Sequence, residues 1–138
     1  MPLTREAELD PSRRGGVANA ISNMMVRLLS EYAGRGPTSA RTYIHDDLVT
    51  VVMHNTLTKA EHRLVEIGQR EHVRSTRRLI QDAMRDEAVG HVEELMGRKV
   101  IAFLSDNHMD PDLAVETLLL EPRDSGENPE TGDSDPAP

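Results

Sequence analysis

Two groups of arginine residues stand where they could bind an anion. The glycine-rich segment GRGPT, residues 34–38, carries Arg35 next to Gly36, and Arg41 follows shortly after it. Farther along, further arginines fall within an arc of about 100 degrees if their segment forms one continuous helix. These arginines are Arg63, Arg70, Arg74, Arg77, Arg78 and Arg85. Glycine amides can approach a phosphate, and a guanidinium group binds an oxyanion through two parallel hydrogen bonds.

The predicted anion site combines the glycine-rich loop with one turn of the later helical segment. Its members are Arg35, Gly36, Arg41, Arg74 and Arg77. The site requires that this segment pack near the start of the first strand pair. Guanidinium groups gathered there would repel one another unless an anion or carboxylates lay between them. Salt bridges to Glu71, Asp46 or Asp47 are the competing interpretation, and we favour them.

The loop itself is a weak phosphate-binding motif. A P-loop needs a lysine and a hydroxyl after its second glycine, whereas here Pro37 removes a backbone amide. The favoured interpretation is therefore a helix end that leads into a strand. Acidic residues also alternate with the arginines of the helical segment, which favours a solvated or partner-facing charged surface. These acidic residues are Glu66, Glu71, Asp82 and Asp86.

No motif predicts a metal centre or a catalytic residue. The segment DNHMDPD places oxygen and nitrogen ligands at alternate positions, as in a calcium loop, at Asp106, His108, Asp110 and Asp112. Pro111 replaces the turn glycine and no glutamate stands at the twelfth position, so a hairpin turn is favoured. The histidines form no HExxH pair and no serine lies in a nucleophile elbow. We therefore expect no catalytic residue, no metal and no cofactor, and an enzyme is the less favoured class.

Composition narrows the class of protein further. The 138 residues include no cysteine, which excludes disulfides, thiolate catalysis and cysteine-ligated metals. Only one Phe, two Tyr and no Trp are present, which argues against binding of single-stranded nucleic acid through base stacking. No run approaches the roughly 18 apolar residues of a membrane span, and the start lacks the layout of a signal peptide. A soluble, cytoplasmic protein is expected.

The charge pattern divides the chain into three parts. Of the net charge of −8, residues 123–138 contribute −4, from five acidic residues and one arginine. That segment is polar and contains Pro and Gly, so it cannot bury enough apolar surface to fold. We predict a flexible N-terminus over residues 1–12, one α+β domain over 13–122 and a disordered acidic tail over 123–138.

The first half of the domain predicts a helix followed by a strand pair. Apolar residues at steps of three and four, including the pair Met24 and Met25, indicate an amphipathic helix over residues 13–33. Gly34 suits a left-handed cap at the end of that helix. Strands are expected near 40–45 and 48–54, and the second is so apolar that it should be central or covered on both faces.

The second half predicts a bent helical segment and another strand pair. Thr58 and Glu61 form the pattern of a capping box, and helical sequence then continues to Gly97. The apolar stripe changes phase near Gly68, so we expect a break between residues 67 and 73. Strands should follow on both sides of the turn segment NHMDPD. The predicted fold is two-layer α+β, with a four-stranded antiparallel sheet and helices on one face.

The series of motifs resembles the MpsC-like family over about residues 13–122. The resembling motifs are GRGPTSARTYI, DDLVTVVMHNTLTKAEHRLV, VRSTRR, VEELMGRKVIAFLSDNHMDPD and VETLLLEP. The family is named for a sodium-translocating, membrane-potential-generating system and was long catalogued as a domain of unknown function. The resemblance implies a link to membrane ion or bicarbonate transport but no catalytic residue.

Two functions remain open at this point. The favoured one is a non-enzymatic, soluble accessory or regulatory protein that forms a homodimer or larger homo-oligomer and docks onto a membrane-transport protein. The alternative is a module that binds a small anion or nucleotide, with or without enzymatic activity. It would use the arginines of the predicted anion site and the amides around Gly36.

Overall fold

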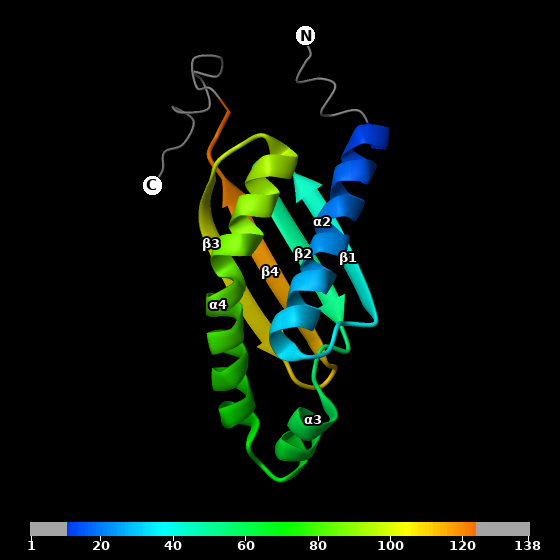
Figure 1. Ribbon diagram of the computed structural model, residues 1–138, viewed down its shortest axis with the longest axis vertical. Helices are drawn as coiled ribbons and strands as arrows, with labels where there is room; N and C mark the ends of the chain where they lie inside the picture. The colour runs from blue at the N-terminus through cyan, green and yellow to red at the C-terminus, as the bar shows by residue number, and fades with distance from the viewer. Residues whose placement is uncertain (1–10, 124–138) are drawn as a thin grey trace, which may run out of the picture.

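The computed structural model describes residues 11–123, and these form an α+β fold (Figure 1). The elements follow the predicted order of helix, two strands, helical segment and two strands. They are α2 (Pro11–Ala33), β1 (Ser39–His45), β2 (Leu48–His54), α3 (Lys59–Glu66), α4 (Arg70–Met96), β3 (Val100–His108) and β4 (Leu113–Leu120). The predicted fold class is confirmed.

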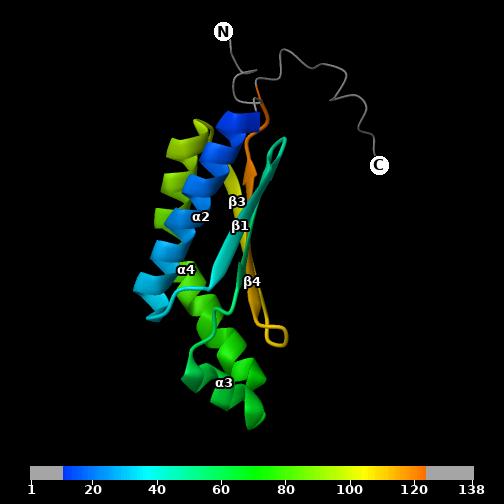
Figure 2. The same ribbon diagram turned by 90° about the vertical axis from the view of Figure 1, so that its right-hand side faces the viewer.

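The sheet has four antiparallel strands in the order β1-β2-β4-β3. Each predicted strand pair is a hairpin, and the two hairpins join through β2 and β4. The prediction that the apolar strand β2 is central is therefore confirmed. Figure 2 shows α2 and α4 on one side of the sheet, and no described helix or strand on the other. We call the outward-pointing side chains of this uncovered side the open face.

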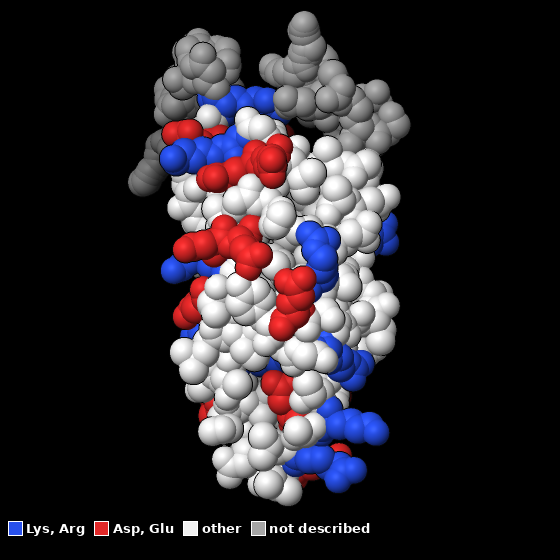
Figure 3. Space-filling view, viewed as in Figure 1, with Lys and Arg blue, Asp and Glu red and all other residues white. Residues whose placement is uncertain are grey.

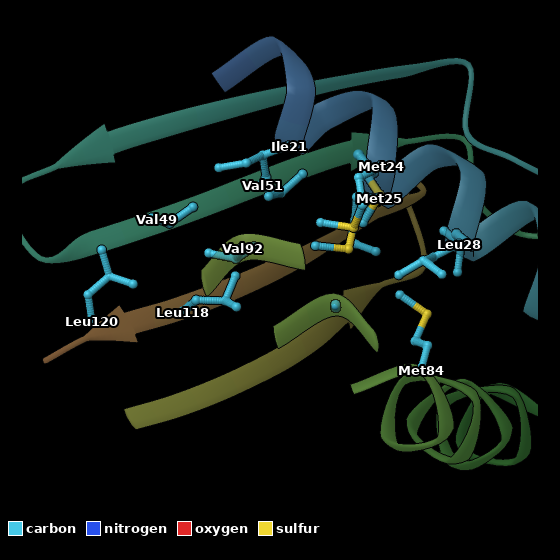
Figure 4. Close-up of a cluster of buried hydrophobic side chains, with 14 residues drawn as sticks. Ile21, Met24, Met25, Leu28, Val49, Val51, Met84, Val92, Leu118 and Leu120 are labelled. Carbon is cyan, nitrogen blue, oxygen red and sulfur yellow. The ribbon is translucent and has the colours of Figure 1, made fainter. Parts of the chain in front are cut away.

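The core lies between the two long helices and the sheet (Figure 4). The helix α2 contributes the predicted apolar stripe, in which Met24 and Met25 are ordinary core residues. The strands contribute alternate residues, as a sheet with one covered face requires. The buried members are Ile21, Met24, Met25, Leu28, Leu29, Val49, Val51, Met53, Met84, Ala88, Val92, Ala114, Leu118 and Leu120. Each large aliphatic side chain buried in this way contributes about 1.5–3 kcal/mol to folding.

Glycines end the helices where the sequence predicts it. Gly34 has φ +84° and its amide donates to the Ser30 carbonyl over 2.9 Å at the end of α2. Gly97 ends α4 with φ +66°, and Gly68, with φ +89°, lies in the break between α3 and α4. A side chain with a Cβ is strained at these φ values, so glycine is the residue that allows the chain to turn. The predicted break between residues 67 and 73 is thereby confirmed.

The ends of the chain fit the prediction less closely. The helix α2 begins at Pro11, two residues before the predicted start at 13, and proline suits the first turn because its missing amide has no partner there anyway. The predictions of a flexible start and of a disordered acidic tail concern residues that, apart from Pro11, Ser12 and Arg123, lie outside the described ones. Both stay predictions.

The capping box at the start of α3 is present as predicted. The Thr58 hydroxyl accepts from the Glu61 amide over 3.1 Å, and the Glu61 carboxylate accepts from the Thr58 amide over 2.8 Å. Two amides that the helix cannot satisfy are thus both paired.

Replacing Thr58 by alanine is expected to lower the free energy of unfolding by about 1 kcal/mol, because the Glu61 amide loses its acceptor. Urea denaturation at pH 7 measures the change. Thr76→Ala is the matched control, since Thr76 is exposed in α4 and its hydroxyl bonds within the same helix to His72. Equal stability of the two variants would contradict a stabilising role for the box.

Candidate functional site

Polar side chains from four parts of the chain meet at residues 56–58, within the connection between β2 and α3. Asp112, in the turn before β4, holds the start of this connection. Its Oδ1 accepts from the Thr56 amide at 3.0 Å and from the Thr56 hydroxyl at 3.1 Å, and its Oδ2 accepts from the Leu57 amide at 3.1 Å. His62 Nε2 lies 3.2 Å from the same Oδ2. The turn of one hairpin is thereby fixed to the end of the other.

Arg77 reaches the same connection from α4. Its side chain is only 1% exposed. Nε donates to Glu61 Oε2 at 2.9 Å, while Nη2 donates to Glu61 Oε1 at 2.5 Å and to the Thr56 carbonyl at 2.7 Å. Two parallel bonds between a guanidinium and a carboxylate form the strongest type of side-chain hydrogen bonding. This contact fixes the angle between α3 and α4.

The charge of Glu61 is stabilised by this arrangement. Burial raises the pKa of the carboxyl, but hydrogen bonds from Arg77 and from the Thr58 amide lower it further than burial raises it, so the net pKa is below its ordinary value. The carboxylate is therefore ionised at neutral pH and neutralises Arg77.

The residues of the predicted anion site are only partly brought together. Arg35 donates from Nη1 to the Leu57 carbonyl at 3.2 Å, next to the carbonyl that Arg77 contacts. Arg74 donates to the Asn107 carbonyl at 2.8 Å and lies 3.6 Å from Glu71, one of the competing partners expected from the sequence. Arg41 is separate, because it belongs to the open face of β1, where its guanidinium carbon lies 5.4 Å from the Tyr43 ring centre.

Gly36 allows the loop to pass close to α2. A Cβ at this position would lie 3.4 Å from the Ser30 Cβ and 3.6 Å from a Val26 methyl. These are packing contacts between the loop and the last turns of the helix. The anion that the sequence predicts for Gly36 and the arginines stays a prediction.

A second buried polar group lies under α4 and was missed by sequence reasoning. Glu116 of β4 is fully buried, and it accepts a hydrogen bond from Ser105 and another from Gln81 Nε2, the latter at 2.9 Å. Gln81 also exchanges two hydrogen bonds with the Asn107 side chain, at 3.1 and 2.9 Å. Burial raises the pKa of Glu116 to about 7, since these neutral donors only partly offset the loss of water.

A signal for this group was present in the sequence. In the strand segment AVETL, Glu116 alternates in phase with the core residues Ala114 and Leu118. A period of two therefore directs its carboxylate to the covered face. Gln81 likewise follows Arg77 by four positions on α4, where one helical face is buried.

Within residues 11–123 no group of three or more His, Asp or Glu side chains could hold a metal ion. Asp112, which the sequence placed in a calcium-like spacing, instead accepts hydrogen bonds from two backbone amides and a hydroxyl.

Figure 3 shows acidic and basic side chains interspersed on the helical side of the molecule. Among the helices of residues 11–123, none combines the length and the apolar sequence that a membrane span requires.

Comparison with known families gives the relationship of the chain. The family model described as "Na+-translocating membrane potential-generating system (MpsC)" matches residues 13–122. The chain belongs to the MpsC family. The resemblance seen in the sequence is thus confirmed. Residues 56–58 lie within the matched part, and so do Arg35 and Arg77, which contact them.

A curated protein of similar length is also related to the chain. The chain is 26% identical over 102 residues to the uncharacterised protein YrhF of Bacillus subtilis (strain 168), an alignment that covers 72% of this chain and 84% of the relative. No solved structure matches the chain.

Proposed function

We propose that this MpsC family member is a non-enzymatic accessory or regulatory protein that acts in the cytoplasm. It self-associates as a homodimer and docks onto a membrane protein for ion or bicarbonate transport. The family description supports the link to a membrane-potential-generating system. The geometry supports a protein that binds other proteins.

The observation that carries the proposal is the contrast between the buried charges and the open face. Arg77, Glu61, Asp112 and Glu116 are all engaged by partners in the same chain. Within residues 11–123, no buried side-chain nitrogen or oxygen lacks a hydrogen-bond partner. A catalytic group would instead be directed at a place where substrate can lie. The open face, by contrast, presents large apolar side chains, which are typical of interaction surfaces.

Membrane vesicles provide the test of the transport link. Inverted vesicles from cells that lack the gene for this chain should develop a smaller Na+-dependent potential, measured with a potential-sensitive dye. Added purified protein should restore the potential, whereas heat-denatured protein should not. A potential and a bicarbonate uptake that are the same with and without the chain would overturn the proposal.

A second candidate function is the binding of a small anion or a nucleotide. One observation favours it, namely that Arg35 and Arg77 approach neighbouring carbonyl groups at residues 56 and 57. Arg74 lies one helical turn before Arg77, so three of the predicted arginines and Gly36 could contribute. An anion that binds Arg77 would have to compete with the Glu61 carboxylate.

Calorimetry tests this second candidate. If it holds, bicarbonate, phosphate, sulfate or a nucleotide titrated into the protein should give a saturable heat of binding. Arg35→Ala should weaken that binding about tenfold or more, the effect of losing one charge-assisted hydrogen bond. Arg78→Ala is the matched control, since Arg78 is an exposed arginine on the same helix as Arg77. The absence of saturable heat for every anion would reject the candidate.

A further inference from the structure

The open face is the surface that we infer to bind a second copy of this chain, sheet against sheet. The inference rests on the self-association proposed above and specifies the surface, the symmetry and the residues that set it. It is carried by the register of the sheet, which places Arg41 at one edge of this face and Asp106 at the other edge of the same row.

Four rows of side chains cross the open face, each with one residue from β1, β2, β4 and β3. In one row Arg41 stands at the β1 edge and Asp106 at the β3 edge, with Val52 and Val115 between them. In the next row Tyr43 stands at the β1 edge and Leu104 at the β3 edge, with Thr50 and Thr117 between them. In the third row His45 stands at the β1 edge and Ala102 at the β3 edge, with Leu48 and Leu119 between them. The fourth is Ser39, His54, Leu113 and His108.

Large apolar groups on this face are exposed in the single chain. Leu104 is 63% exposed and Tyr43 is 52% exposed, and Leu48 and Leu119 in the centre are also exposed. A face of an antiparallel sheet that remains in water normally carries polar residues. The exposed large apolar side chains in these rows therefore indicate that another surface covers the face.

The charges show why a second copy fits. A two-fold axis that runs along the strands, between β2 and β4, places β1 of one protomer over β3 of its partner and keeps each row opposite the same row. Arg41 of each protomer then faces Asp106 of the other, and Tyr43 faces Leu104. The surface is complementary to itself, as a two-fold interface requires. An axis across the strands would instead place Asp106 against Leu104 and lose this pairing.

The size of the sheet favours an interface that covers the whole face. Four strands about 4.8 Å apart, over seven residues of about 3.4 Å each, give a flat area of about 450 Å² before side-chain relief is included. A specific interface buries about 800 Å² of accessible surface on each partner, so partial overlap would be too small. Packing of the two sheets with their strands nearly aligned covers the face most completely.

Charge exchange tests the inference. Wild-type protein at tens of micromolar should have twice the 15.4 kDa mass of one chain in light scattering after size exclusion. Arg41→Asp and Asp106→Arg should each weaken the dimer about tenfold or more, because like charges then face each other twice. The double variant Arg41→Asp with Asp106→Arg should restore the dimer.

Apolar variants provide the matched control. Leu104→Asp on the open face should give a monomer, whereas Leu79→Asp on α4, where the leucine is 69% exposed, should leave the dimer intact. Circular dichroism confirms that each variant is folded. A monomeric wild type overturns both this inference and the proposed self-association, whatever else occupies the face. A dimer that survives Leu104→Asp and both single charge changes overturns only the surface assigned here, and the vesicle assay stands apart from both results.

Discussion

Replacing Arg77 by alanine is expected to lower the free energy of unfolding by about 3–5 kcal/mol, the largest loss that we predict. The substitution leaves the Glu61 carboxylate, whose side chain is largely buried, without its two hydrogen bonds from the guanidinium. It also leaves the Thr56 carbonyl without its donor. A largely buried carboxylate that loses its counter-charge is costly, because water reaches it poorly and the Thr58 amide alone remains as a donor.

Urea denaturation at pH 7 measures this loss. Arg78→Ala is the matched control, since Arg78 is the next residue of α4 and is exposed, and it should change stability by no more than about 0.5 kcal/mol. The double variant Arg77→Met with Glu61→Gln removes both charges and should recover part of the loss. A decrease of less than about 1 kcal/mol for Arg77→Ala would show that the pair does not stabilise the fold.

Acid provides a second measurement on the same pair. The pKa of Glu61 in the folded chain is below its ordinary value, so the stability it contributes is present above about pH 4.5 and is lost as the pH falls through the folded-state pKa. Without Arg77 the carboxyl loses the guanidinium hydrogen bonds that lower its pKa and keeps only those with Thr58. The Arg77→Ala variant should therefore lose less additional stability than the wild type between pH 5 and pH 3.

The elements of the fold were predictable because their signals are local. The capping box spans Thr58 to Glu61, and Gly34, Gly68 and Gly97 mark helix ends or the break within the helical segment. Period-two and period-three-to-four patterns then assign the covered faces of strands and helices. The strand order β1-β2-β4-β3 was not predictable, because no local signal says which strand of the second hairpin lies next to β2.

The site was predictable in its parts and not in its pairing. The sequence selected Arg77 because of its place in a row of arginines, and it selected Glu61 because of the capping box. Arg77 and Glu61 meet because of the direction in which the chain turns at Gly68. The spacing of residues along one helix does not predict that direction. Asp112 is a similar case. The spacing of the acidic residues around it indicated a turn, but it did not indicate that Asp112 accepts hydrogen bonds from the Thr56 and Leu57 amides.

Replacing Glu116 by glutamine is expected to stabilise the protein above neutral pH. Burial raises the pKa of this carboxyl to about 7, so the folded chain favours its protonated form. The stability that the protonated group contributes is complete below the ordinary pKa of about 4.5 and is lost as the pH rises through 7. The difference between the two pKa values corresponds to about 3 kcal/mol when the loss is complete.

Glutamine keeps the shape and the hydrogen bonds of the protonated carboxyl. Its oxygen can accept from Gln81 Nε2, and its amide can donate to the Ser105 hydroxyl, which can rotate to accept. Because glutamine does not ionise, the variant should not lose stability over this pH range. The stability gain of Glu116→Gln over the wild type should therefore be about 2–3 kcal/mol larger at pH 8 than at pH 5.

Urea denaturation of both proteins at pH 5 and pH 8 decides the matter, with Glu94→Gln as the control. Glu94 is exposed on α4, so its replacement should change stability by the same small amount at both pH values. A gain for Glu116→Gln that does not depend on pH would mean that Glu116 does not titrate in this range. A gain that grows with pH would show that the chain holds a carboxyl under α4 whose ionisation opposes folding near neutral pH.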